Sequence, residues 1–150
     1  MATNGHTLVY GGGNVGLMGA IADSVLDNNG KVIGVIPKFL MDREVGHTSL
    51  TSLEIVTSMH ERKKRMADLS DAFIAIPGGW GTLEEIGEIL TWKQLGLLNQ
   101  PVSILNINGF FDPLLEQMQR MVTEGFLQEQ NFHSIKTSNS PAKILSFLIP

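Results

Sequence analysis

Two glycine-rich turns in the sequence have the composition of phosphate-binding loops. They are GGGNVGLMG at residues 11–19 and PGGWGTLEE at residues 77–85, and each follows an apolar run and opens a helix-like segment. The free N–H groups and the positive dipole end at the start of a helix attract anions, and glycine lets a phosphate approach the backbone closely. The alternative is that the glycines only permit a tight turn and close packing. Because ligands bind at the carboxyl edge of a parallel sheet, we expect both turns to line one crevice.

The glutamate that ends the second turn, Glu85, is a candidate catalytic group. We expect a helix over residues 82–97, on which Glu85 shares a second, partly apolar face with Trp92. Partial burial can tune the pKa of such a carboxylate and aim it at a sugar. The alternative is a capping box, in which Thr82 and Glu85 only satisfy N–H groups at the helix end.

A basic segment, MHERKKRMADLS, contains a second candidate, Arg62. On a helix, Met59, Arg62 and Met66 fall on one stripe, so Arg62 points where the core is expected, and Lys63 borders that stripe. A guanidinium held there needs an anion, either a carboxylate such as Glu85 or a ligand phosphate. The alternative is an arginine whose stem passes the apolar side chains and whose charge reaches solvent.

The elements that would position these residues alternate between strands and helices. Apolar, β-branched runs predict strands at 7–10, 31–36, 53–56, 72–76 and 102–105, and periodic segments predict helices at 16–28, 59–70, 82–97, 111–124 and 141–147. Because the strands are almost continuously apolar, we expect helices on both faces of a parallel sheet. The predicted fold is therefore α/β, a Rossmann-like, doubly wound parallel sheet in a three-layer α/β/α arrangement. The irregular stretch at 37–52 is long enough to be functional.

Composition limits the classes of partner. A chain of 150 residues with 43% hydrophobic content can bury one core, so we expect a single domain over residues 1–150. The net charge of −4 argues against a nucleic-acid or anionic-membrane surface, and no apolar run is long enough to span a bilayer. We expect a soluble, cytoplasmic protein. There is no cysteine and the four histidines lack metal-ligand spacing, so we expect no metal site.

The motifs resemble those of the LONELY GUY (LOG) family of cytokinin riboside 5′-monophosphate phosphoribohydrolases, which older descriptions label lysine decarboxylase-like. The resemblance runs nearly end to end, through LVYGGGNVGLMG, GVIPKFLMDREV, MHERK, PGGWGTLEE, TWKQLG and NINGFFDPLL. It implies that Arg62 and Glu85 occupy the two catalytic positions of the family. It also implies substrate-binding or phosphate-binding roles for Gly12, Gly13, Glu44, Lys63, Gly78, Gly79, Gly81, Thr82, Glu84 and Thr91.

The activity implied by the resemblance is hydrolysis of the N-glycosidic bond of a nucleoside 5′-monophosphate to free base and ribose 5-phosphate. Such a reaction passes through an oxocarbenium-like sugar that a carboxylate stabilises, a role suited to Glu85. We assign the 5′-phosphate to the second glycine turn and Arg62 to the ribose phosphate or the departing base. Decarboxylation of an amino acid usually requires pyridoxal phosphate on a lysine, and the lysines here lack that context, so we expect no cofactor. The family also implies a homodimer.

The sequence departs from the family at its start. Only six residues precede the Thr7 strand, where the family carries a further strand, a turn and a helix. We therefore expect the first family strand to be missing, which leaves the Thr7 and Ala72 strands without the partner between them. Either the sheet closes differently, another chain fills the gap, or the sequence is part of a longer protein.

Three other functions stay open. The chain could be a broader purine or pyrimidine 5′-monophosphate nucleosidase, because nothing in the sequence specifies a prenylated adenine. It could also be a non-catalytic nucleotide or phosphorylated-cofactor carrier, similar to molybdenum-cofactor carrier proteins. A third alternative is a fragment that has lost its function. The presence of both Arg62 and Glu85 favours catalysis, since a carrier needs no carboxylate at the sugar.

Overall fold

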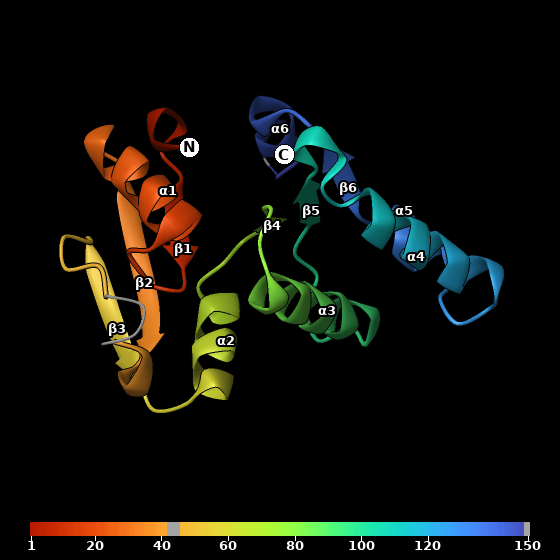
Figure 1. The fold of residues 1–150 in the computed structure, drawn as a ribbon, viewed down its shortest axis with the longest axis horizontal. Coiled ribbons are helices and arrows are strands. Elements are labelled where there is room, and N and C mark those ends of the chain that lie inside the picture. The colour runs from red at the N-terminus through yellow and green to blue at the C-terminus, as the bar shows by residue number, and fades with distance from the viewer. Residues whose placement is uncertain (42–45, 149–150) are drawn as a thin grey trace. The chain divides into compact units, whose positions relative to one another are not determined.

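A computed structural model of the chain describes residues 1–41 and 46–148. The chain divides into two compact units, Met1–Ser70 and Asp71–Pro150, and each has its own sheet (Figure 1). The single domain expected from the sequence stays a prediction. No helix in the described ranges has the length and apolar character needed to cross a membrane.

The unit Met1–Ser70 is built on three parallel strands in the order β1-β2-β3. Two helices and two short 3-10 turns accompany them. The elements in chain order are η1 (Ala2–Asn4), β1 (Thr7–Tyr10), α1 (Gly16–Asp27), β2 (Lys31–Pro37), η2 (Lys38–Leu40), β3 (Ser52–Val56) and α2 (Met59–Asp68).

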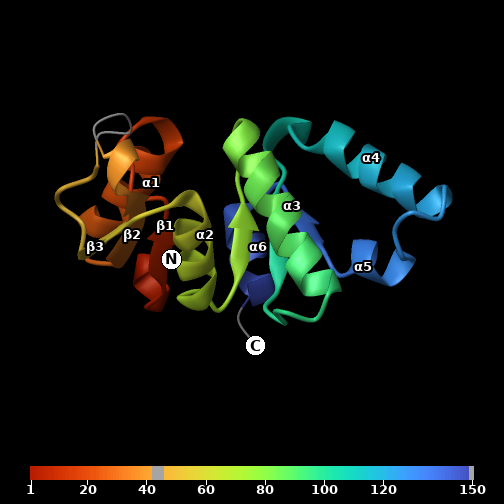
Figure 2. The ribbon, with the colours of Figure 1, turned by 90° about the horizontal axis from the view of Figure 1, so that it is seen from below.

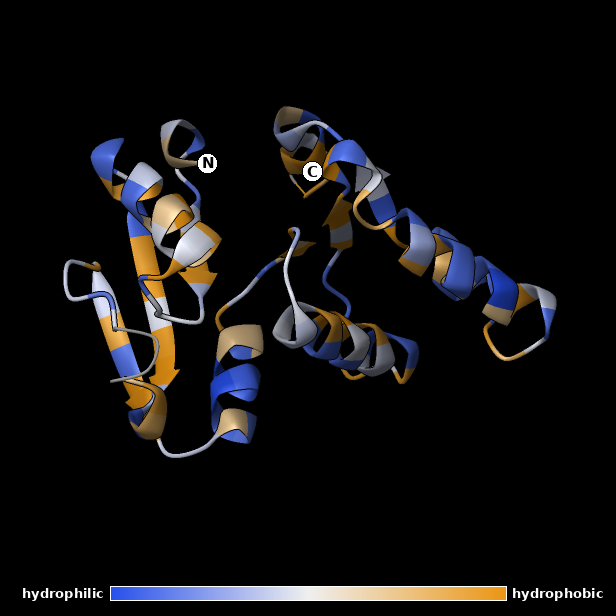
Figure 3. Ribbon diagram, in the orientation of Figure 1, coloured by the Kyte–Doolittle hydropathy of each residue, from blue (hydrophilic) through white to orange (hydrophobic). Residues whose placement is uncertain are grey.

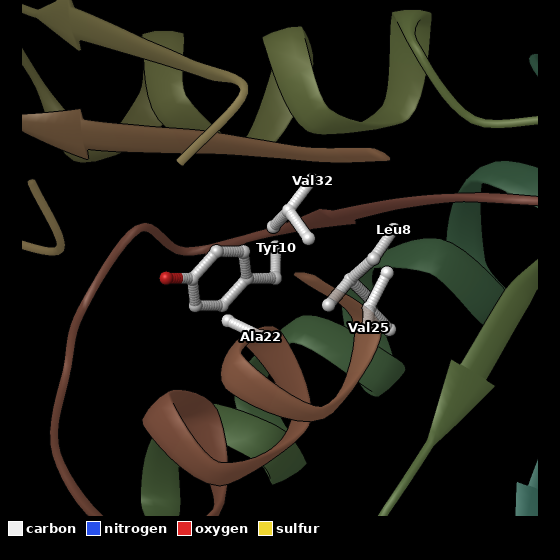
Figure 4. Close-up of a cluster of buried hydrophobic side chains, with 5 residues drawn as sticks. All are labelled: Leu8, Tyr10, Ala22, Val25 and Val32. Atoms are coloured by element: carbon white, nitrogen blue, oxygen red, sulfur yellow. The ribbon is translucent and has the colours of Figure 1, made fainter. Parts of the chain in front are cut away.

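The core of this unit lies between β1, β2 and α1. Figure 4 shows the Tyr10 ring and Val32 from the strands together with Ala22 and Val25 from the helix. Val32 and Ala22 have no exposed surface. Full burial of a valine side chain such as that of Val32 contributes roughly 1.5–3 kcal/mol to the stability of the fold. β2 is apolar along most of its length (Figure 3), as expected of a strand covered on both faces.

The unit Asp71–Pro150 has a second parallel sheet in the order β4-β5-β6. Its core joins Ile86, Ile104 and Phe111, and the sheet lies between α3 on one side and α6 on the other (Figure 2). The elements are β4 (Phe73–Ala75), α3 (Trp80–Gln94), β5 (Val102–Leu105), η3 (Ile107–Gly109), α4 (Asp112–Thr123), α5 (Glu129–His133), β6 (Lys136–Ser138) and α6 (Pro141–Leu148).

The structure confirms the five predicted strands and the five predicted helices, with shifts at their ends. The largest shift is in α3, which begins at Trp80 and ends at Gln94. β6 and α5 were not predicted. β1 pairs with β2 and β4 with β5, so the strands of the described residues form two sheets, and no described strand lies between the Thr7 and Ala72 strands as a partner of both, as expected.

Candidate functional site

The first glycine turn runs from the end of β1 to the start of α1. Gly12 has a φ of 76°, and a Cβ there would lie 3.1 Å from Leu53 Cδ1 and 3.2 Å from Ile36 Cβ, so both conformation and space require glycine. Gly12 and Gly13 are buried, whereas residues 14–16 are exposed. The burial favours a packing role for these two glycines and leaves the backbone at 14–16 as the part of the turn that a ligand can reach.

The helix after this turn, α1, begins without a side-chain cap. Its N-cap residue is Val15, and no side chain in the described residues accepts a hydrogen bond from its first N–H groups. α2 differs, because Ser58 accepts from the Glu61 N–H at 3.1 Å and Glu61 Oε2 accepts from the Thr57 N–H at 2.8 Å. A helix start that no side chain satisfies can receive an anion from solvent.

Arg62 is buried in α2, with 5% of its surface exposed. Its Nε donates to the Val35 carbonyl at 3.1 Å and its Nη2 donates to the Gly11 carbonyl at 2.8 Å. This burial excludes the alternative in which the charge reaches solvent. The guanidinium of this α2 residue therefore joins the first glycine turn to β2 by hydrogen bonds to a backbone carbonyl of each.

Two contacts hold α2 in place around Arg62. Arg65 forms a two-pronged pair with Glu54 of β3, at 2.6 Å and 3.0 Å, which lowers the pKa of that carboxyl. At the helix start, hydrogen bonds from Thr57 lower the pKa of Glu61. Lys63 is half-buried, as its position beside the inner stripe predicted.

The second glycine turn follows β4 and is open to solvent. Gly78, Gly79 and Gly81 are exposed, and a Cβ on Gly79 or Gly81 would meet no described atom within 4 Å. Neither of these two residues has a positive φ. Gly81 lies in the helix with open space around it, so neither internal packing nor a special backbone conformation requires glycine there, whereas Gly79 has φ −99° and ψ −149°, outside the helical and extended regions.

The alternative of a capping box at Thr82 and Glu85 is not borne out. The helix begins at Trp80 with Gly79 as its N-cap, so Thr82 lies inside the first turn and cannot be the cap. The first helical hydrogen bond runs from the Leu83 N–H to the Gly79 carbonyl, and no side chain in the described residues caps this end. The hydroxyl of Thr82 instead lies against Gly78, where an added Cβ would clash with it.

The remaining predicted site residues differ in exposure. Glu85 is half-buried on α3, next to the buried Ile86, whereas Glu84 and Thr91 are exposed. The Thr91 hydroxyl donates to the Gly87 carbonyl at 2.7 Å within the same helix. Glu44 lies outside the described residues.

A polar recess of about 430 Å³ lies at the carboxyl ends of β5 and β6, the sheet edge at which the second glycine turn follows β4. This recess was not predicted from the sequence. Its floor includes Asn106, which donates to Asp112 at 2.7 Å and accepts from the Phe111 N–H at 2.8 Å. The lining residues are Asn106, Ile107, Asn108, Gly109, Asp112, Thr137, Ser138 and Asn139.

A second feature that sequence reasoning missed is His47. It is 4% exposed, and its ring contacts Asp23 of α1 while its N–H donates to the Gly12 carbonyl. A single histidine in an irregular stretch gives no sequence signal for such contacts. Within residues 1–41 and 46–148, no cluster of three His, Asp or Glu residues could hold a metal ion.

Comparison with known proteins gives matches over most of the chain. Residues 18–148 match the family model described as possible lysine decarboxylase. The chain is 51% identical over 129 residues to the cytokinin riboside 5′-monophosphate phosphoribohydrolase LOG of Oryza sativa subsp. japonica, covering 86% of this chain and 53% of that protein. It is 46% identical over 141 residues to the corresponding enzyme LOG1 of Arabidopsis thaliana, covering 94% and 66%. The chain thus spans between about half and two thirds of the length of these relatives.

Among solved structures, the chain is similar to the molybdenum cofactor binding protein from Rippkaea orientalis. The TM-score is 0.69 with 22% sequence identity, over 97% of this chain and 77% of the other. At this identity the similarity shows the fold alone. It confirms the Rossmann-like α/β class with parallel strands and flanking helices.

Proposed function

We propose that this chain, which belongs to the family described as possible lysine decarboxylase, hydrolyses the N-glycosidic bond of a nucleoside 5′-monophosphate. The products are the free base and ribose 5-phosphate. The names of the relatives from Oryza sativa and Arabidopsis thaliana support this reaction. The chain spans only part of the length of those relatives.

One observation carries the proposal, the open second glycine turn. Gly79 and Gly81 have space around them, and Gly81 is already helical, so alanine would fit the fold at position 81. Glycine inside a helix costs roughly 1 kcal/mol relative to alanine, which makes Gly81 unfavourable for folding alone. The uncapped N–H groups beside these glycines are suited to a phosphate, with the Thr82 hydroxyl as a further donor.

In the proposed reaction, the bond between C1′ of the ribose and the base nitrogen breaks, and a water oxygen becomes attached to C1′. One proton of the water goes to the departing base or to solvent. Positive charge develops on the sugar ring as the bond breaks, and the carboxylate of Glu85 stabilises it and orients the water. The half-buried position of Glu85 supports this role, because a less hydrated carboxylate interacts more strongly with a developing cation.

Arg62 is proposed as the second catalytic residue. Two of its nitrogens are used by the Gly11 and Val35 carbonyls, so its positive charge is held in a fixed place behind the first turn. A fixed positive charge favours binding of a doubly charged phosphate or of an anionic leaving base. Substrate-binding roles stay proposals for Gly12, Gly13, Glu44, Lys63, Gly78, Glu84 and Thr91.

A carrier of nucleotides or phosphorylated cofactors is the second candidate. The similarity to the molybdenum cofactor binding protein is one of fold only, at 22% identity. A carrier needs the glycine turns but gains nothing from a carboxylate at the sugar. Tight binding of a nucleotide without release of base would therefore favour the carrier.

We also propose a homodimer that acts in the cytoplasm. Apolar side chains that are costly to leave in water lie on and just after α3, among them Trp80 at 88% exposed and Leu97 at 71% exposed. Such side chains are typical of a surface that a partner covers. Sedimentation equilibrium of the purified chain tests this, and a monomeric mass at micromolar concentration would contradict the dimer.

The activity is tested by incubating the purified chain with AMP, with isopentenyladenosine monophosphate and with adenosine. We expect base release from at least one monophosphate and none from adenosine, because the turns are proposed to bind phosphate. Equal release from adenosine would refute the phosphate role. The ratio of the two monophosphates separates a cytokinin-specific enzyme from a broader nucleosidase.

A further inference from the structure

The imidazole of His47 is buried in the unit Met1–Ser70 and uses both ring nitrogens. Nδ1 accepts a hydrogen bond from the Ser49 N–H at 3.2 Å, and Nε2 lies 2.9 Å from Asp23 Oδ1. Because Nδ1 is an acceptor, the proton of the neutral ring is on Nε2 and is donated to the carboxylate. The ring is therefore held in one tautomer and one orientation.

The backbone around His47 is joined to the first glycine turn. The His47 N–H donates to the Gly12 carbonyl at 2.9 Å, and Gly46 forms an antiparallel bridge with Gly13. Asp23 lies on α1, the helix that this turn opens. His47 thus contacts two points of the segment that leads from β1 into α1. Its backbone N–H binds Gly12, just after β1, and its side chain binds Asp23, in the second turn of α1.

The charged and polar groups around this contact come from two elements. Asp23 has 59% of its side chain exposed, so an ion pair alone would contribute little here. Its charge also acts on Tyr10 of β1, since burial first and Asp23 second raise the pKa of Tyr10 to about 12. The contact between His47 and Asp23 therefore orients the two side chains and contributes little to stability through the attraction of charges.

We propose that His47 is a positioning residue for the first glycine turn. Together with Asp23, it holds this turn in the geometry that receives a 5′-phosphorylated nucleoside. His47 does not itself contact the substrate. It fixes the backbone of Gly12 and Gly13, and through Asp23 it fixes α1 relative to that backbone. The exposed residues 14–16 lie between these two fixed points. The substrate part of this inference depends on the proposed function, whereas the part about the turn does not.

The first test measures the turn without any ligand. Hydrogen exchange of backbone amides in the purified chain is compared for the unchanged sequence, His47→Ala and His133→Ala. His133 is a matched control, because it pairs with Glu129 at 3.3 Å on an exposed helix. We expect His47→Ala to speed exchange of the backbone amide at position 47, which donates to the Gly12 carbonyl, at least about tenfold, with little change in β2. No change in the exchange of the amide at position 47 would overturn the inference, whatever the activity of the protein.

The second test separates positioning from general stability. For base release from AMP, we expect His47→Ala to raise KM about tenfold or more while kcat changes less, and Asp23→Ala to have a similar effect. Since both remove the same contact, the double variant should be little worse than either single one. Asp23→Asn keeps an acceptor for Nε2–H and should rescue most of the loss.

The outcomes distinguish the two proposals. If the unchanged chain releases no base but exchange of the amide at position 47 responds to His47→Ala, the proposed function fails and the positioning role stands. If base is released and both variants leave KM and exchange unchanged, the positioning role fails alone. Additive effects of the His47 and Asp23 substitutions on KM would also overturn it.

Discussion

Arg62 Nη2 donates a 2.8 Å hydrogen bond to the carbonyl oxygen of Gly11, across 51 residues of sequence. The same guanidinium donates from Nε to Val35, so one side chain on α2 satisfies backbone groups where β1 ends and within β2. A buried carbonyl that loses its donor costs free energy, and a planar guanidinium serves two carbonyls in a way that an ammonium does not. The first glycine turn therefore depends on Arg62 before any substrate arrives.

Replacing Arg62 by lysine is expected to lower the free energy of unfolding by roughly 1–3 kcal/mol, because at least one of the two carbonyls loses its donor. Urea unfolding followed by circular dichroism measures this. Lys64→Ala is the control, since its pair with Asp68 is exposed and worth less than about 0.5 kcal/mol. An Arg62→Lys variant as stable as the unchanged protein would show that these two bonds do not matter for folding.

Gly11→Ala is expected to displace the Arg62 side chain. A Cβ at this position would overlap Nη2 and press on the rest of the guanidinium. We expect a loss of about 1–3 kcal/mol in unfolding free energy, together with loss of base release. Differential scanning calorimetry and the AMP assay check the two effects, and normal values in both would contradict the close packing of these residues.

Gly79→Ala and Gly81→Ala are expected to separate folding from binding. Both sites have room for a methyl group, and Gly81→Ala should raise the free energy of unfolding by up to about 1 kcal/mol because it lies in a helix. If a phosphate approaches this backbone, the same methyl groups should raise KM for AMP by about tenfold or more. Gly87→Ala, further along α3 and equally open, should stabilise the helix without changing KM.

Tyr10 is expected to ionise about two pH units later than a free tyrosine. Its pKa is raised from 10.0 to about 12, mainly by burial and then by Asp23. Because the folded pKa lies above the unfolded one, the folded state keeps its full stability below pH 10 and loses this contribution as the pH rises from 10 to 12. Tyr10 is the single tyrosine of the chain, so the ultraviolet absorbance of tyrosinate reports it directly.

The matched variant for this titration is Tyr10→Phe. The Tyr10 hydroxyl is buried and has no hydrogen-bond partner in the described residues, so phenylalanine keeps the packing and removes an unsatisfied group. We expect the variant to be as stable as the unchanged protein at neutral pH and less sensitive between pH 10 and 12. Tyrosinate forming near pH 10 in the folded protein would contradict the burial of this ring.

The strands were predictable because each is a short, nearly continuous apolar run. β6 was not, since its three residues Lys136–Ser138 are polar and largely exposed, although they pair with β5. The start of α3 was placed two residues late because Thr82 followed by Glu85 has the spacing of a capping box. Trp80 and Gly81 are already helical, and Gly79 forms the cap position instead.

The inward direction of Arg62 was also predictable from the helical stripe. An anion was expected as its partner, whereas two of its acceptors are the backbone carbonyls of Gly11 and Val35. Backbone acceptors contributed by distant strands leave no mark in a residue pattern. The same reason explains why the contacts of His47 with Asp23 and Gly12 escaped prediction.

The most direct measurement of the central claim is the product balance with a nucleoside 5′-monophosphate for the unchanged chain, Glu85→Gln and Glu88→Gln. Glu88 is one turn further along α3 and serves as the control. We predict equal amounts of free base and ribose 5-phosphate from the unchanged chain and from Glu88→Gln, and a loss of at least about a hundredfold in rate for Glu85→Gln. Base release that survives Glu85→Gln, or a folded protein that binds the nucleotide and releases no base, would contradict the account.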